Sequence, residues 1–223
     1  MTYETIILDI SGHIATITLN RPDAMNSFTK RMMDECAHAW RHIAETDDIH
    51  CAVLRAAPGR AFSTGVDVKA AMQPGGSVMH ENIWTAEDPG EKLGPKSNRC
   101  WKPVICAVHG MAAGGAFYWI NEADIVICSE DATFFDPHVT YGMTAALEPI
   151  GATYRMPLGD VLRMALLGND ERISAHTALR LGLVTEVTPN ETLWDRAQAL
   201  AEIVAAKPPA ATAGTVKAIW ESL

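Results

Sequence analysis

Hydrophobic and polar positions follow two different periods in the first quarter of the chain. The segment HIATITLN, residues 13–20, alternates apolar and polar side chains as a half-buried strand does. Residues 28–47 instead repeat apolar side chains at helical spacing. The short run CAVLRA, at 51–56, is continuously apolar, which is typical of a strand buried on both faces. The pattern therefore predicts a strand, a helix and a buried strand in succession.

The same alternation continues toward the C-terminus. VICAVHG and DIVICS, both within residues 102–130, are predicted buried strands, and LVTEV is a further strand. Helices are predicted over 159–168 and 174–182, where Ser174 suits an N-cap and Gly182 a C-terminal stop. Two more helices, ETLWDRAQALAEIVAA and PAATAGTVKAIWESL, finish the chain. Strands that alternate with helices predict an α/β fold.

Residues 72–99 follow neither period. They are polar and rich in Gly and Pro, so we interpret them as a mobile surface segment, partly helical near 78–84, that could cover a site. Apart from this segment there is no clear linker or repeat. We predict one core domain over 1–190 and a C-terminal helical segment over 191–223.

Composition excludes several classes of protein. The 223 residues are 48% hydrophobic and carry a net charge of −9, which indicates a globular core and argues against non-specific binding of nucleic acid. No apolar run approaches the roughly 18–20 residues of a membrane span, and the N-terminus does not resemble a signal peptide. Five cysteines without CxxC spacing indicate reduced thiols, so we expect a cytoplasmic protein that needs no metal.

Two glycine-bearing segments suggest where chemistry takes place. In AVHGMAAGGAFYW a strand turns into a helix at Gly114 and Gly115, and the first N–H groups of a helix have no partner inside it. RAFSTGVDVKA, residues 60–70, also follows a buried strand and could present the N–H of Val66. Two such donors could hold one developing oxyanion, although glycines at 114 and 115 would equally suit close helix–strand packing.

Five motifs in order carry a family resemblance. LNRPDAMNSF, AFSTGVDVK, PVICAVHGMAAGGAF, EADIVICSEDATFFDP and RISAHTALRLGLVTEV resemble the successive motifs of the crotonase superfamily, which includes enoyl-CoA hydratases and isomerases. The resemblance extends from about residue 5 to about residue 190. It implies an α/β fold of ββα units wound into a spiral, with a helical C-terminal part that builds a homotrimer or a dimer of trimers.

The resemblance also implies a substrate and a site. The substrate would be an acyl-CoA whose thioester oxygen sits between the N–H groups of Val66 and Gly115, with coenzyme A present only as part of the substrate and no other cofactor. By motif position, the residues that would bind it are Arg21, Met25, Ser63, Gly65, Asp67, Lys69 and Gly114. Arg21 and Lys69 are the candidate partners of the CoA phosphates, although each could be an ordinary solvated charge.

The chain departs from the hydratase pattern at both acid–base positions. Hydratases of the family resemble one another in having a glutamate in G-G-x-x-E, where this chain has Tyr118, and another in Q-P-E, where it has His138. A histidine exchanges protons near neutrality because its ordinary pKa is about 6.5. Asp136 could orient the ring if the chain bends at Pro137, and Glu148, ten residues on, could point into the same pocket or simply cap a helix.

Three functions fit these residues. The first is oxyanion-assisted acid–base chemistry on a CoA thioester in the manner of an enoyl-CoA hydratase or isomerase, a lyase of fatty acid metabolism, with His138 in place of glutamate. The second is a hydrolase of a β-diketone or of a CoA thioester, because a few similar proteins have a histidine near this position and an acid soon after it. The third is a non-catalytic acyl-CoA-binding protein. Similar proteins usually continue for another helix or two beyond GTVKAIWESL, so the helical segment is interpreted as shortened.

Overall fold

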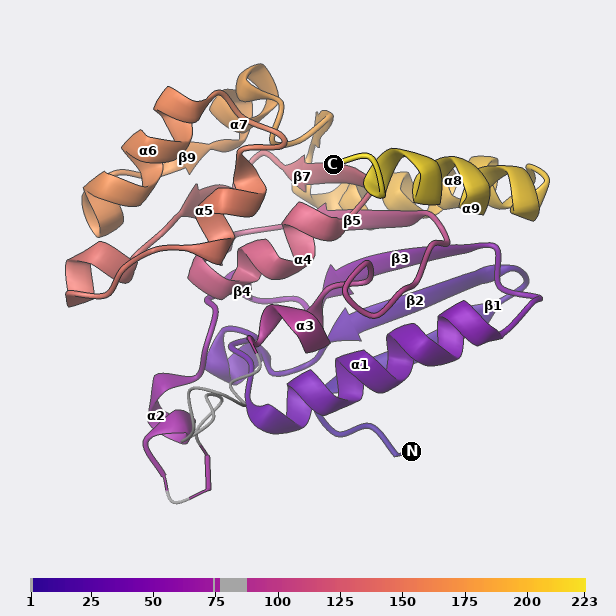
Figure 1. The fold of residues 1–223 in the computed structure, drawn as a ribbon, viewed down its shortest axis with the longest axis horizontal. Helices are drawn as coiled ribbons and strands as arrows, with labels where there is room; N and C mark the ends of the chain where they lie inside the picture. The colour runs from indigo at the N-terminus through magenta and orange to yellow at the C-terminus, as the bar shows by residue number, and fades with distance from the viewer. Residues whose placement is uncertain (1, 74, 77–87) are drawn as a thin grey trace.

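A six-stranded sheet forms the centre of the molecule (Figure 1). The structure is a computed structural model that describes residues 2–73, 75–76 and 88–223. The strand order is β1-β2-β3-β5-β7-β10, and all neighbours are parallel except β1 and β2. The strands are β1 (Ile6–Ser11), β2 (Ile14–Leu19), β3 (Cys51–Ala56), β5 (Val104–Val108), β7 (Ile125–Ser129) and β10 (Glu186–Thr188).

A smaller sheet continues three of these strands. Its order is β4-β6-β8-β9, in which β4, β6 and β8 are parallel and β9 is antiparallel to β8. The strands are β4 (Ala61–Ser63), β6 (Met111–Ala113), β8 (Thr133–Phe135) and β9 (Ile173–Ser174). Each of β3, β5 and β7 is followed at once by its short partner, so the polypeptide leaves the large sheet three times at the same edge. The residues that follow β4, β6 and β8 are thereby brought together.

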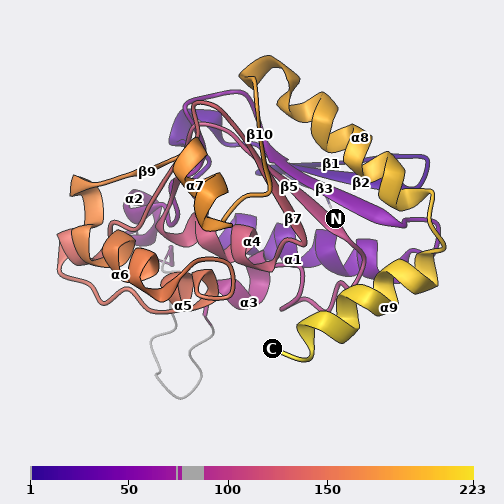
Figure 2. The same cartoon turned by 90° about the horizontal axis from the view of Figure 1, so that it is seen from above.

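Helices cover both faces of the large sheet (Figure 2). On one face α1 (Lys30–Glu45) buries Cys36, Trp40 and Ile43, and its N-cap Thr29 accepts a hydrogen bond from the N–H of Met32. On the other face α8 (Leu193–Ala205) packs on alternate residues of the same strands. The remaining helices are η1 (Pro22–Ala24), α2 (Val68–Ala71), α3 (Gly90–Leu93), η3 (Gly114–Ala116), α4 (Phe117–Glu122), η4 (His138–Tyr141), α5 (Leu147–Ala152), α6 (Leu158–Leu167), η5 (Gly168–Asp170), α7 (Ala175–Leu181), η6 (Asn190–Thr192) and α9 (Pro209–Trp220).

The interpretation of residues 72–99 as a surface segment is wrong for its C-terminal part. The predicted helix near 78–84 lies outside the described residues. Residues 93–96 are buried, and the indole N–H of Trp40 donates to the carbonyl of Leu93 at 2.7 Å. Because this bond satisfies a buried polar pair, α3 is fixed to the core beside α1. The polar composition of the segment did not reveal that these residues are buried.

Other sequence predictions are confirmed. Ser174 caps α7 and Gly182 ends it with φ of 87°. The strand predicted at LVTEV begins only at Glu186, because Leu183 is still bonded to the carbonyl of Ala178 and is buried beneath the helix end. The five cysteines are free and buried. Among the described residues, no helix is long and apolar enough to cross a membrane.

Candidate active site

The two glycine-bearing loops meet at one point. Gly65 has a φ of 80°, and a Cβ atom at this position would lie 2.8 Å from the backbone nitrogen of Gly115. Phe28 donates to the carbonyl of Gly65 and accepts from the N–H of Asp67, both at 2.8 Å, so the intervening N–H of Val66 points away from Phe28. Within the described chain neither Val66 nor Gly115 donates its N–H to another group. The backbone thus places two free donors on adjoining segments, as a site for a developing oxyanion requires.

The acid–base segment lies directly beside these donors. Gly114 has a φ of 50°, and a Cβ there would lie 3.4 Å from the ring of Pro137 and 3.6 Å from Cε1 of His138. These are ordinary van der Waals distances, so the segment that carries the histidine packs directly on Gly114. The positive φ is the reason that glycine is favoured at this position.

His138 is held by Asp136 across the bend at Pro137. Strand β8 ends at Phe135, and Pro137 adopts φ −82° and ψ −5°, which turns the chain into η4. Asp136 is wholly buried, and its Oδ1 accepts from the backbone N–H of His138 at 3.1 Å and from Nδ1 at 2.5 Å. The prediction that Asp136 orients the ring is confirmed. The hydrogen bond to Asp136 raises the pKa of His138 above 6.5, although partial burial acts in the opposite direction.

Glu148 faces the other side of the imidazole. It lies in the first turn of α5, yet its side chain is only 8% exposed, and its Oε1 is 3.7 Å from Nε2 of His138. The amide of Asn121 on α4 donates to the backbone carbonyl of Glu148 at 2.8 Å and so fixes the helix start. Burial raises the pKa of the Glu148 carboxyl. A separation of 3.7 Å is too long for a direct hydrogen bond but leaves one reacting group within reach of both side chains.

Tyr118 extends this cluster away from His138. Its hydroxyl donates to Oδ2 of Asp88 at 3.3 Å. Burial, followed by the charges of Glu148 and Asp88, raises the pKa of Tyr118 well above its ordinary value. Sequence reasoning missed Asp88, because it lies in the polar segment 72–99 and no motif marks it.

Glu122, one helical turn after Tyr118, serves the fold. Its carboxylate accepts from the backbone N–H groups of Lys96 at 2.6 Å and Ser97 at 2.9 Å, and from the Ser97 hydroxyl. The ammonium of Lys96 binds Asp124 at 2.7 Å instead. Shared helix spacing with Tyr118 therefore does not bring Glu122 into the site.

The residues predicted to bind substrate lie mostly in two segments that contact each other, the loop before Phe28 and the segment from β4 to α2. Arg21 forms an ion pair with Asp67 at 2.8 Å and donates to the carbonyl of Ser27, which ties the loop before Phe28 to the loop after β4. The Ser63 hydroxyl donates to the carbonyl of Asn26 at 2.9 Å and accepts from the N–H of Gly65 at 3.2 Å. Met25 and Lys69 are exposed. The binding roles of these residues remain predictions.

Among the described residues no group of three or more His, Cys, Asp or Glu side chains could hold a metal ion. On α1, His38 and His42 lie four residues apart and make separate contacts. Nδ1 of His38 pairs with the hydroxyl of Tyr3 at 2.8 Å, and the His42 side chain is exposed.

The sequence profile of the family Enoyl-CoA hydratase/isomerase matches residues 9–222. The chain belongs to this family. Its members are enzymes that act on CoA thioesters, and the fold expected from the crotonase resemblance is confirmed by solved structures of enoyl-CoA hydratases. An enoyl-CoA hydratase/isomerase from Mycobacterium paratuberculosis superposes with a TM-score of 0.89 at 39% identity, covering 99% of this chain and 84% of that one.

Characterised relatives catalyse different reactions. The (E)-benzylidenesuccinyl-CoA hydratase of Thauera aromatica is 33% identical over 215 residues, which cover 96% of this chain and 81% of the relative. The 1,2-epoxyphenylacetyl-CoA isomerase of Escherichia coli K12 is 32% identical, covering 92% of this chain and 78% of the relative. Similarity of this degree shows the family, whereas the reaction depends on the side chains of the site.

Proposed function

We propose that this enzyme of the enoyl-CoA hydratase/isomerase family carries out acid–base chemistry at the α and β carbons of an enoyl-CoA thioester, with His138 and Glu148 in place of two glutamates. The observation that carries the proposal is the position of His138, held by buried Asp136 on one side and facing buried Glu148 on the other, directly against Gly114. This imidazole has one nitrogen fixed and the other turned toward a proton partner. Such an arrangement is what general acid–base catalysis needs.

In the proposed reaction the thioester oxygen lies between the N–H groups of Val66 and Gly115. These donors stabilise negative charge as it develops on the oxygen, and the loss of one such donor typically costs about 2.7–4 kcal/mol. Nε2 of His138 removes a proton from water, which adds to the β carbon. Glu148, whose carboxyl has a raised pKa, supplies a proton to the α carbon. The reaction adds water across the double bond with no net oxidation or reduction, so the proposal includes no cofactor beyond the CoA part of the substrate.

The remaining contacts to substrate follow the motif positions. Met25, Ser63, Asp67 and Lys69 lie on the two loops beside the donors, and Arg21 joins those loops through its ion pair with Asp67. Because Arg21 is already paired, we assign the stronger phosphate contact to exposed Lys69. Isothermal titration of Lys69→Ala with CoA, compared with wild-type protein, tests this assignment.

An assay of enoyl-thioester absorbance tests the reaction itself. Purified protein is given short and medium enoyl-CoAs, and His138→Ala and Glu148→Ala are measured beside the exposed-histidine control His176→Ala. Turnover that the first two variants lose and the control keeps supports the proposal. Absence of turnover, with acyl-CoA still bound in a parallel titration, contradicts it and leaves a hydrolase or a non-catalytic acyl-CoA-binding protein.

Hydrolysis is the second candidate, and one observation favours it. A histidine oriented through Nδ1 by a buried aspartate is also the general-base part of hydrolytic sites. The same imidazole could direct water at the carbonyl of a β-diketone or of the thioester. Release of free CoA, followed with a thiol reagent, distinguishes thioester hydrolysis from hydration, which leaves the thioester intact.

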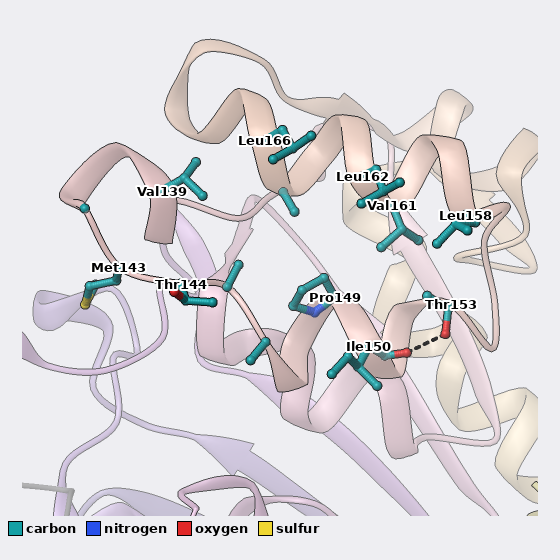
Figure 3. Close-up of a pocket in the computed structure, with 14 residues that line it drawn as sticks. Val139, Met143, Thr144, Pro149, Ile150, Thr153, Leu158, Val161, Leu162 and Leu166 are labelled. Carbon is teal, nitrogen blue, oxygen red and sulfur yellow. Dashed lines mark hydrogen bonds between the residues drawn. The ribbon is translucent and has the colours of Figure 1, made fainter.

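We also propose that the enzyme is cytoplasmic and forms a homotrimer or a dimer of trimers. Five free, buried thiols support the location. Supporting the assembly, an open apolar groove of about 530 Å³ lies between α6 and the segment from η4 to α5 (Figure 3). Exposed side chains along it include Ile150, Leu158, Leu162 and Leu166. Exposed apolar surfaces of this kind mark protein contacts, and light scattering of Leu162→Glu against wild type tests the assignment.

A further inference from the structure

Glu148 lies on a helix that cannot hold its own position. Helix α5 has only six residues, and its N-cap residue is Ala146, whose side chain cannot accept a hydrogen bond from the first turn. A helix this short is not stable alone, so its place in the fold depends on packing against other elements. Residues 141–144, which precede α5, are exposed and give it little support. The position of the Glu148 carboxyl therefore depends on the element beneath α5.

That element is α4, and two side chains join the helices in opposite directions. The two helices pack side by side (Figure 1). From α4, the amide of Asn121 donates to the backbone carbonyl of Glu148 at 2.8 Å. From the turn after α5, the guanidinium of Arg155 donates to the carbonyl of Asn121 at 3.1 Å and to that of Ala123. Each helix is thus bonded to the backbone of the other, once near the start of α5 and once beyond its end.

The contact at Gly151 shows how closely the helices approach. A Cβ atom there would lie 2.4 Å from Nδ2 of Asn121 and 3.1 Å from its Cβ, so glycine leaves room for the amide. Asn121 is buried, and the carbonyls that accept from Arg155 are at the C-terminal end of α4, where helix carbonyls have no partner inside the helix. Because buried polar groups need partners, these bonds favour one arrangement of the two helices.

The same support carries the oxyanion side of the site. The short helix η3 precedes α4 directly and contains Gly115, whose N–H is one of the two free donors. Helix α5 in turn places Oε1 of Glu148 at 3.7 Å from Nε2 of His138. The bonds between α4 and α5 therefore set the carboxyl relative to both the oxyanion donor and the imidazole.

We propose that Arg155 and Asn121 are positioning residues that hold Glu148 opposite His138, a role that rests on the proposed function. Neither side chain touches the reacting groups in this scheme, and both act through the backbones of α4 and α5. The rate depends steeply on such placement, because a shift of about 1 Å can cost about 100-fold. Loss of these bonds should lower kcat and leave KM nearly unchanged.

Arg155→Met tests this role against a general loss of stability. Methionine keeps apolar bulk but donates no hydrogen bond, so we expect kcat to fall about 10- to 100-fold, and Arg155→Lys to restore part of it. Lys102→Met is the matched control, because Lys102 also donates to a carbonyl at a helix end, that of Thr46 after α1. The control should lower the melting temperature and keep wild-type kcat.

Gly151→Ala tests the same contact without removing a hydrogen-bonding group. The added methyl must displace the amide of Asn121 or move α5 away from α4, so kcat should fall although alanine favours a helix over glycine. Gly159→Ala on α6 is the matched control, because among the described residues no atom beyond its own helix backbone lies within 4 Å of a Cβ there. Gly151→Ala also decides the question if Arg155→Met does not fold, and wild-type kcat in this variant contradicts the proposal.

Proton NMR of the His138 imidazole gives a readout that needs no turnover. The charge of Glu148 contributes to the raised pKa of His138. Displacement of Glu148 in Arg155→Met should therefore lower this pKa, whereas Lys102→Met should leave it at the wild-type value. An unchanged pKa in Arg155→Met contradicts the positioning role.

The outcomes separate this inference from the proposed function. If Arg155→Met keeps wild-type kcat while His138→Ala loses it, the positioning role is wrong and the proposed function stands. Equal losses of kcat in Arg155→Met and Lys102→Met show general destabilisation and also overturn the role. If the wild-type protein has no turnover, the proposed function fails, and the NMR titration alone decides whether Arg155 positions Glu148.

Discussion

The site has an oxyanion side and an acid–base side, and these consist of different chemical groups. On the oxyanion side the groups are backbone N–H donors of Val66 and Gly115, held by the close approach of Gly65. On the acid–base side they are side chains, above all His138 and Glu148, which come from the end of β8 and the start of α5. Backbone dipoles keep one orientation and no titratable proton, whereas the side chains exchange protons with solvent. We therefore expect the first side to tolerate no added atoms and to act equally at every pH.

The acid–base side is also coupled within itself. The pKa values of His138 and Glu148 are both raised, and each group acts on the other across 3.7 Å. Two such groups titrate as a pair rather than singly. The working state in the proposed reaction has one proton on the pair, with the imidazole neutral and the carboxyl protonated.

The largest expected effect is that of His138→Ala, which breaks the acid–base side alone. We expect kcat to fall by about 10²- to 10⁴-fold, because one general acid–base group typically contributes this much. Binding of an unreactive acyl-CoA should change little. Stopped-flow or steady-state absorbance assays measure the first effect and calorimetric titration the second. A variant that keeps wild-type kcat would remove the imidazole from the mechanism.

Gly65→Ala breaks the oxyanion side. The new Cβ would lie 2.8 Å from the nitrogen of Gly115 at a backbone φ of 80°. The segments that carry the N–H groups of Val66 and Gly115 must therefore move apart. We expect kcat to fall about 10²- to 10³-fold, as on loss of one donor, and by the same factor at every pH. Gly12→Ala is the matched control, because φ is also positive there but no atom lies within 4 Å. A loss that varies with pH would show that the two sides are not separate.

The pH profile of kcat/KM sharpens the comparison further. The pair gains a second proton on the acidic limb and loses its last proton on the basic limb, so the profile should be bell-shaped. The apparent pKa values of the two limbs should be higher than the ordinary values of 4.5 for Glu and 6.5 for His, because the pKa values of both groups are raised. His138→Ala should abolish the bell shape of the profile. Gly65→Ala should lower kcat/KM at every pH and leave the two apparent pKa values unchanged.

The smallest effects are on stability, at buried Glu148 and at half-buried Glu122. The folded-state pKa of Glu148 is raised, so wild-type protein loses stability as pH rises from about 4.5 through that pKa. Glu148→Gln does not titrate, and its melting temperature should exceed that of wild type increasingly as pH rises. Thermal unfolding at several pH values checks this sign.

Glu122→Gln tests a glutamate of α4 that we assign to the fold and not to the site. Its carboxylate accepts hydrogen bonds from the backbone of Lys96 and from both donors of Ser97. A glutamine has fewer acceptor sites, and the net contribution of one hydrogen bond is about 0.5–1.5 kcal/mol. We expect a lower free energy of unfolding in urea and an unchanged kcat. A loss of kcat at normal stability would move Glu122 into the site.

The sequence by itself determined the local features, whose conformation depends on residues close together in the chain. The α/β alternation, the caps of α7 and the turn from β6 into the glycine-led helix follow from hydrophobic period and from glycine at set positions. The bend at Pro137 and the pairing of Asp136 with His138 are equally local, because they span three residues whose backbone angles proline restricts.

Only the tertiary structure decided which distant groups meet. Helix spacing allowed Glu122 to join Tyr118, but the turn at Lys96 and Ser97 occupies Glu122, and Asp88, thirty residues earlier in the chain than Tyr118, contacts the tyrosine instead. Glu148 could have been a surface cap, yet the packing of α5 on α4 buries it against His138. The reason is physical: backbone angles fix contacts within a few residues, whereas contacts between elements depend on how whole helices pack.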